Sequence, residues 1–248
     1  MFCPVVIVPF YNHGPALEKM APRLAKEGLP VLIIDDGSTP EHTQMAQKVC
    51  QKHHFFYTQN AQNGGKGAAV ITGLRWAIKE KYTHAVQIDA DGQHDLSDIK
   101  AFLALAKRNP RALITAQPVY DSSAPKARLY GRKITGFWVW IETAGRLKLD
   151  TMCGFRVYPL SPMKKVLPHL WFHRMGFDVE ILVKSFLDGV PILGQKTRII
   201  YPKDGVSHFH AFRDNLEISC VHACLCLYSV WKSMKMHIFS KQLVSCIL

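Results

Sequence analysis

Short continuous runs of apolar residues recur along the first half of the chain, and segments of mixed polarity separate them. Continuous apolar runs are typical of strands that are buried on both faces of a parallel sheet, whereas a half-exposed strand alternates apolar and polar positions. The intervening segments place apolar residues three and four positions apart, which predicts amphipathic helices. The predicted strands cover residues 5–8, 30–34, 55–58, 85–88 and 113–115.

Four helices are predicted between these strands from their start and stop residues. Pro15 begins the first, and Gly28 is expected just after its end, in the left-handed conformation that glycine adopts readily. Thr39 and Pro40 predict the N-cap and the first position of the second. The alternation of strands and helices predicts an α/β protein with a doubly wound, mostly parallel sheet. The third and fourth helices are expected over residues 67–81 and 97–108.

The pattern changes after Gln117, where a polar loop leads into a long helix that is rich in aromatic residues. Because the elements that follow no longer alternate regularly, the C-terminal part of the sheet is expected to be mixed. We expect a single domain over residues 1–213 and a helical basic tail over 214–248. The later elements are a strand near 155–158, a helix over 177–187 and a strand over 192–201.

Net charge adds an asymmetry to this pattern. The 248 residues carry 31 Lys and Arg against 19 Asp and Glu, a formal net charge of +12. Residues 1–120 hold 13 basic and 10 acidic side chains, and the remainder holds 18 and 9. A basic C-terminal half suits a phosphate-bearing ligand or an anionic membrane surface. The chain has no recognised nucleic-acid-binding motif, so nucleic acid is not an expected partner.

Cysteine usage and the lack of a long apolar run bear on where the chain works. Seven scattered cysteines, in a chain long enough to bury its own core, predict reduced thiols and a cytoplasmic protein. No apolar run approaches the roughly 18 residues that a membrane-spanning helix needs. The long aromatic helix, with Lys133, Arg146 and Lys148 nearby, instead predicts peripheral contact with the cytoplasmic face of an anionic membrane, as does the basic tail.

Polar clusters directly follow three of the predicted strands. Residues 9–12 follow the first strand, residues 35–38 the second and residues 89–94 the fourth. In an open α/β sheet, ligands bind outside the carboxyl ends of the strands, so these clusters are expected to line one crevice. A single such cluster is typical of a capping turn, but three at equivalent positions favour a ligand site.

Two of these polar residues and a glycine-rich loop indicate phosphate chemistry. Asp89 and Asp91 are two residues apart at a strand end, and their carboxylates repel one another unless a cation joins them. Hard oxygen ligands favour Mg²⁺ or Mn²⁺, whose shells are commonly completed by water and substrate phosphates. Residues 60–67 open a helix where backbone N–H groups and Lys66 can meet a phosphate, although the loop matches neither a Walker A loop nor the dinucleotide fingerprint.

In these motifs the chain resembles the family 2 glycosyltransferases of the GT-A fold, particularly the dolichyl- and polyprenyl-phosphate sugar synthases. The resemblance implies an inverting, metal-dependent transfer of a sugar from a nucleoside-diphosphate sugar to an acceptor. The implied acceptor is lipid-linked, a polyprenyl phosphate or a glycolipid, in the synthesis of cell-envelope glycan or glycolipid. It also implies a nucleotide-binding half over 1–117 and an acceptor half over 118–213. The matching segments are residues 6–12, 34–38, 63–67, 87–94 and 150–156, in the family's order.

The resemblance also implies roles for individual residues. The expected contacts to the nucleotide sugar are Pro9, Tyr11, Asn12, Asp35, Asp36, Lys66 and Asp89. The expected ligands of Mg²⁺ or Mn²⁺ are Asp89, Asp91 and Gln93. The expected contacts to the acceptor phosphate or the donor sugar are Arg128, Arg132 and Arg156.

The need for a general base depends on the acceptor. A phosphate is already ionised near neutral pH, since its second pKa is about 6, whereas a hydroxyl needs a carboxylate within hydrogen-bond reach. The candidates are Asp178 and Glu180, followed by Asp150 and Asp204. Two alternatives remain open: a non-catalytic relative that binds a nucleotide sugar or an acidic lipid, and a nucleotidyltransferase. The latter would release pyrophosphate from a nucleoside triphosphate, but the chain lacks an N-terminal glycine-rich triphosphate loop.

Overall fold

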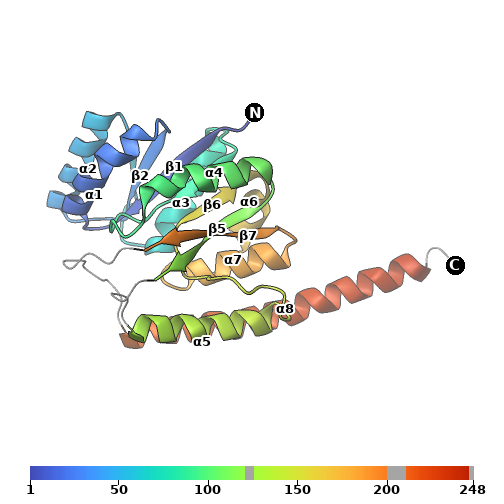
Figure 1. Ribbon diagram of the computed structural model, residues 1–248. Coiled ribbons are helices and arrows are strands. Elements are labelled where there is room, and N and C mark those ends of the chain that lie inside the picture. The colour runs from blue at the N-terminus through green and yellow to red at the C-terminus, as the bar shows by residue number, and fades with distance from the viewer. Residues whose placement is uncertain (121–125, 200–210, 246–248) are drawn as a thin grey trace.

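A computed structural model describes the backbone of residues 1–120, 126–199 and 211–245, and their side chains except for 126–128, 211–213 and 235–245. One seven-stranded sheet runs through the middle of the molecule, with helices on both faces (Figure 1). The strands are β1 (Pro4–Phe10), β2 (Val31–Asp35), β3 (Phe56–Gln59), β4 (His84–Gln87), β5 (Leu113–Val119), β6 (Arg156–Pro159) and β7 (Ile192–Arg198).

The sheet is mixed because one strand runs against the rest. The spatial order is β3-β2-β1-β4-β6-β5-β7, and all neighbours are parallel except the two pairs that include β6. The antiparallel β6 lies between β4 and β5, so the residues that precede it arrive at the carboxyl ends of both strands. The expected α/β class, parallel first half and mixed C-terminal part are therefore confirmed.

Helices cover the two faces of the sheet in layers. Core residues from α1, α2 and α4 pack on one face, and core residues from α3, α6 and α7 on the other. The helices are α1 (Gly14–Lys26), α2 (Pro40–His53), α3 (Lys66–Lys79), η1 (Leu96–Asp98), α4 (Ile99–Arg108), α5 (Lys126–Glu142), α6 (Leu160–Val166), η2 (Leu167–His169), α7 (Phe177–Leu187) and α8 (Ala211–Ser245), where η marks 3₁₀ turns.

A further layer lies outside α7. Helices α5 and α8 contact each other, α8 also contacts α7, and α8 then continues past the domain (Figure 1). Val221 and Leu225 of α8 are fully buried, so the first part of the basic tail packs on the domain. Among the described helices, none contains a stretch long and apolar enough to cross a bilayer. The six described cysteines are all free.

The local signals at the helix ends are partly confirmed. Gly28 adopts φ +65° just after α1, in the left-handed region that its position requires. Helix α2 begins at Pro40 as predicted, but Thr39 makes no side-chain capping bond. Its backbone N–H instead donates to Asn12 Oδ1 over 2.9 Å. The N-cap residue is thus held by the loop after β1, and its side chain does not satisfy the N–H groups of the first helical turn.

Candidate active site

The loops that follow β1 and β2 are tied together at the carboxyl edge of the sheet. The Asn12 N–H donates to Ser38 Oγ over 3.0 Å. Asn12 has φ +54°, a left-handed conformation that asparagine tolerates better than most residues. Pro9 is buried in β1, and Tyr11 is half-buried just beyond it. Pro9, Tyr11 and Asn12, three of the residues expected to contact the nucleotide sugar, therefore lie together in the corner formed by these two loops.

Asp35, at the end of β2, is fully buried and shapes the turn that follows. One carboxylate oxygen accepts the Ser38 N–H over 2.9 Å. The other accepts the hydroxyls of Thr43 (2.7 Å) and Tyr57 (2.9 Å). These bonds fix the turn onto α2 and β3. The Asp35 carboxylate therefore holds the turn in place through three protein donors.

Asp36 fixes the glycine-rich loop that precedes α3 in a similar way, by accepting hydrogen bonds from it. Its carboxylate accepts the side-chain amide of Asn60 over 2.7 Å and the backbone N–H of Gly65 over 2.7 Å. Gly65 has φ +95°, and a Cβ there would lie 2.5 Å from Arg174 Cγ, so only glycine fits. Arg174 Nη1 in turn donates to Asn63 Oδ1 over 3.0 Å. The loop is thus held from both sides, with the next residue, Lys66, at the start of α3.

Lys66 joins the two halves of the chain at the centre of the site. Its ammonium lies 2.9 Å from Asp89 Oδ2 and 2.7 Å from Asp178 Oδ2, at the first turn of α7. Burial opposes the charged form, but the carboxylates of Asp178 and Asp89 outweigh it and raise the pKa of Lys66. Lys66 is therefore a fixed cation, at the carboxyl ends of the central strands.

The Asp89 carboxylate receives further support from its own neighbours. The Gln87 side-chain amide donates to Asp89 Oδ1 over 3.2 Å, and His94 Nε2 lies 3.6 Å from Asp89 Oδ2. The Tyr158 hydroxyl donates to Gln87 Oε1 over 2.8 Å and orients that amide. Burial opposes ionisation of Asp89, but Lys66 and His94 outweigh it and hold the pKa well below its usual range. Asp89 is therefore an anion at any physiological pH.

Gly154 closes the site over this ion pair. A Cβ at Gly154 would lie 2.3 Å from Asp89 Oδ2 and 2.5 Å from Lys66 Nζ, closer than real Cβ contacts allow. The backbone of the 150–156 segment therefore packs directly on the charged groups. Any larger residue at this position would have to displace the Asp89 carboxylate or the Lys66 ammonium, whereas the backbone conformation itself does not need glycine, because Gly154 does not adopt a positive φ.

Asp150 anchors the other end of the same segment. Arg132 Nη1, from α5, lies 2.5 Å from Asp150 Oδ2, and Asp150 Oδ1 accepts the Cys153 N–H over 2.9 Å. The Gln117 side chain accepts the Asp150 N–H over 2.9 Å. Burial opposes the charge of Arg132, but Asp150 outweighs it and raises the pKa of the guanidinium. The 150–156 segment thus links α5 to the Lys66 centre.

Arg156 and Glu180, two predicted site residues, are fully buried and bonded to other parts of the protein, which does not favour contact with a ligand. Arg156 is fully buried, and its guanidinium donates to the carbonyls of Cys153 (2.9 Å) and Thr151 (2.6 Å). It holds the 150–156 segment in place instead of facing an acceptor. Arg156 Nη1 has no hydrogen bond among the described residues and lies 3.7 Å from Asp178 Oδ1.

Glu180 likewise differs from its expected role as a base. It is fully buried, accepts the backbone N–H groups of Trp171 and Phe172 (both 2.9 Å) and pairs with Lys184 (2.6 Å). The Glu180 side chain therefore anchors the loop that precedes α7. In the sequence, Glu180 lies two residues beyond Asp178. The single-sequence pattern could not separate these roles, because both carboxylates lie within one turn of the same helix. Asp204 and the side chain of Arg128 lie outside the described residues.

The three expected ligands of a divalent ion, Asp89, Asp91 and Gln93, lie in the stretch that follows β4, and Asp89 is paired with Lys66. Asp91 and Gln93 remain, half-buried in the same loop, where the Gln93 N–H donates to Asp91 Oδ1 over 3.0 Å. The two hard oxygens fit a Mg²⁺ or Mn²⁺ ion, whose other ligands would be diphosphate oxygens and water.

Several residues that build the site carried no signal in the sequence pattern. Arg174 reaches Asn63 across 111 positions of the chain, and Gln117 reaches Asp150 across 33. Such pairs have no fixed spacing, so periodicity cannot reveal them. Gln87 and His94 lie inside the matched 87–94 motif, so their closeness to Asp89 in the sequence was a sign that they could contribute to the site.

Comparison with known proteins agrees with this geometry. The model of Glycosyl transferase family 2 matches residues 5–171. Dolichyl-phosphate beta-glucosyltransferase of Saccharomyces cerevisiae is 29% identical over 215 residues, and that of Dictyostelium discoideum 26% over 209. Each match covers 75% of this chain but only 64% and 63% of the respective relative, so the chain spans less than two thirds of their length.

Solved structures share the fold at low identity. Glucosyl-3-phosphoglycerate synthase from Mycobacterium tuberculosis, in complex with phosphoglyceric acid, has a TM-score of 0.65 at 14% identity, over 91% of this chain and 80% of that one. Staphylococcus aureus TarS, in complex with UDP-GlcNAc, has a TM-score of 0.62 at 17% identity, over 90% and 66%. The fold is therefore the GT-A fold, and the family match over two thirds of the chain places this protein in glycosyltransferase family 2.

Proposed function

We propose that this protein transfers a sugar from a nucleoside-diphosphate sugar to a lipid-linked phosphate. The observation that carries the proposal is the Lys66 centre, where Asp89 and Asp178 flank one fixed cation at the carboxyl edge of a GT-A sheet. The nucleotide would lie in the corner formed by the loops after β1 and β2. The names of the dolichyl-phosphate beta-glucosyltransferase relatives support a polyprenyl-type phosphate as acceptor and glucose as the first sugar to test.

The reaction is a single displacement. An oxygen of the acceptor phosphate forms a bond to the anomeric carbon as the bond from that carbon to the diphosphate breaks. The electron pair leaves with the nucleoside diphosphate, and the configuration at the anomeric carbon inverts. A phosphate acceptor arrives ionised and loses no proton, so positioning cations serve it better than a general base. This matches the described carboxylates: Asp178, Asp150 and Glu180 each have a cationic partner already.

The chain's own residues then have distinct tasks. Asp91 and Gln93 would hold Mg²⁺ or Mn²⁺, which would stabilise the negative charge that develops on the diphosphate. Lys66 keeps Asp89 and Asp178 in place at the floor of the site. Arg132, on α5, is the described cation best placed to meet the acceptor phosphate, and Arg128 lies one turn away on the same helix. The 150–156 segment, which links α5 to the Lys66 centre, sets the distance between Arg132 and Lys66.

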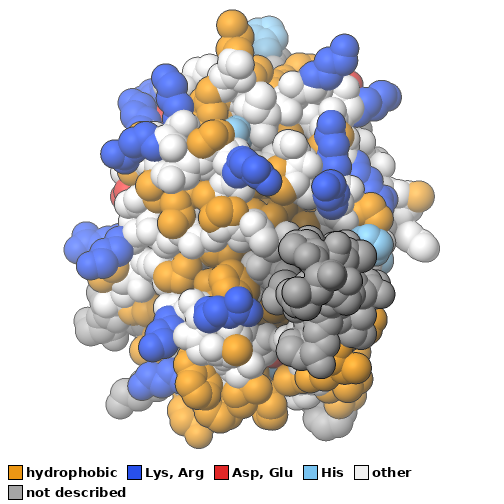
Figure 2. Space-filling view, turned by 90° about the vertical axis from the view of Figure 1, so that its right-hand side faces the viewer, with side chains coloured by type: hydrophobic (Ala, Val, Ile, Leu, Met, Phe, Trp, Pro, Cys, Tyr) orange, Lys and Arg blue, Asp and Glu red, His pale blue; other side chains and the backbone are white. Residues whose placement is uncertain are grey.

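A lipid-linked acceptor would reach the site from the layer that α5 and α8 form. Exposed apolar side chains of α5 and α8 form what we term the outer face, which comprises Ile134, Phe137, Trp140, Val230 and Met234. Figure 2 shows hydrophobic side chains gathered along the lower edge of the molecule, with Lys and Arg side chains above them. This distribution suits a surface that inserts aromatic groups into an anionic bilayer from the cytoplasmic side.

Nucleotide-dependent thermal stabilisation tests the donor site. We expect one of UDP, GDP and dTDP to raise the melting temperature of the wild type, more so with Mn²⁺, because a ligand that binds only the folded state stabilises it. Asp91→Ala should lose the Mn²⁺-dependent part. Asp95→Asn, a neutralised carboxylate in the same stretch of chain, is the control and should keep it. No shift with any nucleotide would contradict the proposal and favour a non-catalytic relative.

Transfer itself is tested with UDP-glucose and a short-chain polyprenyl phosphate. We expect release of UDP and a glycosyl phosphate whose anomeric configuration, read by NMR, is opposite to that of the donor. Retention of configuration would exclude the single displacement. Pyrophosphate release from a nucleoside triphosphate would instead support a nucleotidyltransferase.

A further inference from the structure

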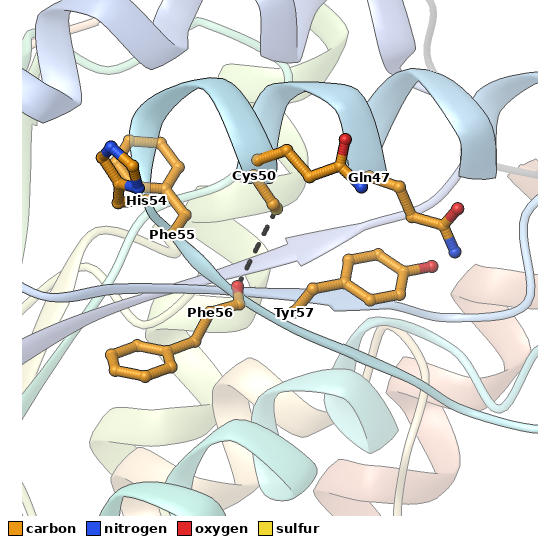
Figure 3. Close-up of a pocket in the computed structure, with 7 residues that line it drawn as sticks. Gln47, Cys50, His54, Phe55, Phe56 and Tyr57 are labelled. Atoms are coloured by element: carbon orange, nitrogen blue, oxygen red, sulfur yellow. Dashed lines mark hydrogen bonds between the residues drawn. The ribbon is translucent and has the colours of Figure 1, made fainter.

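Two hollows lie away from the candidate active site, and they differ in what they offer a ligand. The smaller, of about 460 Å³, lies between the C-terminal end of α2 and the edge strand β3 (Figure 3). Its thiol, Cys50, points at the Phe56 carbonyl oxygen over 3.9 Å, and burial raises the pKa of that thiol to about 12. The thiol therefore stays protonated at neutral pH, and this hollow offers no nucleophile.

The larger hollow, of about 1080 Å³, lies between α6, the C-terminal end of α7 and α8. We refer to it as the distal cleft. It belongs to the opposite edge of the sheet, because Arg111 and Pro191, which line it, immediately precede β5 and β7. Helix α7 separates the distal cleft from the Lys66 centre. Asp178, in the first turn of the helix, faces the Lys66 centre, and Asp188, just after the helix ends, faces the distal cleft. At about 1.5 Å per residue, these two positions are roughly 15 Å apart along the helix.

Three aromatic side chains form one wall of the distal cleft. The rings of Trp171 and Tyr228 meet edge to face at 5.9 Å, and those of Tyr228 and Trp231 lie 5.6 Å apart. The Lys184 ammonium lies 3.0 Å from the centroid of Trp171, which is nevertheless 52% exposed. Leu227 continues this wall along α8 and is 73% exposed. The wall therefore presents exposed apolar and aromatic groups to the cleft, and the ammonium groups of Lys184 and Lys232 lie over its rings.

The rim of the distal cleft is cationic. Arg111, Lys165 and Lys232 line it, and Asp188 is the one acidic residue among its described lining residues. Lys232 pairs with Asp188. Arg111 and Lys165 are exposed and have no recorded ion pair or hydrogen bond within the described part of the chain. The cleft thus combines two uncompensated positive charges with an unfilled aromatic wall.

We propose that the distal cleft binds one molecule of an anionic phospholipid. Arg111 and Lys165 would contact the headgroup phosphate, and the acyl chains would lie against the aromatic wall and Leu227. Charge complementarity favours an anionic headgroup, and the apolar area favours a chain-bearing ligand over a free phosphate, which would leave the wall exposed. The site is separate from the nucleotide corner, so lipid binding there does not depend on the proposed sugar transfer.

Binding of a monomeric lipid tests the distal cleft without a membrane surface. Dihexanoyl phosphatidylglycerol, kept below its critical micelle concentration, is titrated into the full chain, and binding is followed by tryptophan fluorescence and calorimetry. We expect saturable binding. Lys165→Glu should weaken it roughly fivefold or more, since one cation near a lipid phosphate contributes about 1 kcal/mol. Leu227→Glu should also weaken it, because it places a carboxylate against the acyl chains. Matched controls are Lys164→Glu, the adjacent exposed lysine on α6, and Leu216→Glu, an exposed leucine of α8 outside the cleft. Both should bind as the wild type does.

Three results would overturn the proposal. These are equal affinity for dihexanoyl phosphatidylcholine, equal affinity for inorganic phosphate alone, and equal weakening in the control variants. The substituted side chains are exposed, so all four variants should melt within a few degrees of the wild type. Nucleotide stabilisation, measured on the same variants, reports separately on the donor site. A failure of the distal cleft is thereby distinguished from a failure of the proposed transferase.

Discussion

Gly154 is the residue at which the smallest change should have the largest effect on the site. Gly154→Ala places a methyl group against Asp89 and Lys66, so either the ion pair or the 150–156 segment must move. Overpacking of this kind costs about 1–3 kcal/mol. We expect a melting temperature lowered by roughly 2–4 °C per kcal/mol and loss of nucleotide-induced stabilisation, both measured by thermal unfolding.

The matched control for this substitution lies in α5. Gly131 has open space where its Cβ would be, and a helix-interior Gly→Ala change is expected to stabilise by roughly 0.5–1 kcal/mol. Gly131→Ala should therefore melt at or above the wild-type temperature and keep its nucleotide response. Equal behaviour of the two variants would contradict the close packing at Gly154.

Asp89 predicts a pH dependence of stability with a definite sign. Its pKa is lowered in the fold, so its contribution is present above the unfolded value of about 4 and is lost as the pH falls through the folded value. Asp89→Asn should therefore cost about 2 kcal/mol of unfolding free energy at pH 7, and this cost should shrink as the pH falls below about 4. Lys66 does not alter this window, because its pKa is raised and its contribution is lost only at strongly alkaline pH.

Urea unfolding at a series of pH values measures the difference between the wild type and Asp89→Asn. Glu18→Gln, on the exposed face of α1, is the control and should change the unfolding free energy by less than about 0.5 kcal/mol at every pH. A difference for Asp89→Asn that grows toward acid would show that the carboxylate is not stabilised by its cations.

At the scale of elements, α8 is joined to the domain by a buried polar pair as well as by apolar packing. Glu142, at the end of α5, lies 2.6 Å from His222 Nδ1 on α8, and both side chains are buried. Burial raises the pKa of the Glu142 carboxyl. The Ser229 hydroxyl donates to the Glu142 carbonyl over 2.6 Å, so the two helices are also linked about two turns further along α8.

Removing one member of this pair should cost more than removing both. His222→Leu leaves the Glu142 carboxyl buried without its partner, and we expect a loss of roughly 3 kcal/mol. The double variant Glu142→Leu/His222→Leu replaces the pair by apolar groups and should recover most of that loss. Denaturant unfolding of the two single variants and the double variant gives the coupling energy. Additive losses would contradict a direct interaction between the two side chains.

The elements also show what the sequence could and could not predict. Continuous apolar runs correctly predicted the buried strands β1, β2, β4 and β5. The strand predicted over 55–58 also exists, as β3, but it is a partly exposed edge strand and is not buried on both faces as its pattern suggested. The neighbours of these strands in the sheet were not predictable: β6 is too short to reveal its direction, and its place between β4 and β5 depends on contacts such as Tyr158 with Gln87. The same limit applies to the site, where matched motifs pointed to Lys66 and Asp89 but not to the inward orientation of Arg156 and Glu180.

At the scale of the whole molecule, the outer face predicts binding to anionic membranes. In sedimentation with vesicles, we expect the protein to bind phosphatidylglycerol-containing vesicles more strongly than pure phosphatidylcholine, and added salt to weaken that binding. The double variant Phe137→Ser/Trp140→Ser removes exposed apolar area and should bind less. Phe56→Ser, at an exposed aromatic on the edge strand β3, is the control. Equal loss in the control would contradict a specific membrane-facing surface.

The placement of β6 has a consequence for synthesis on the ribosome. Strands β4 and β5 both emerge within the first 120 residues, yet they cannot pair with each other, because β6 must lie between them. Until residues 156–159 emerge, β4 presents an unpaired edge, and β5 has no neighbour at all. Exposed edges of this kind are templates for aggregation. The nascent chain therefore passes through an interval in which a chaperone that covers strand edges would raise the yield of folded protein. This interval closes only when β6 has inserted between β4 and β5 and β7 has paired with the other edge of β5.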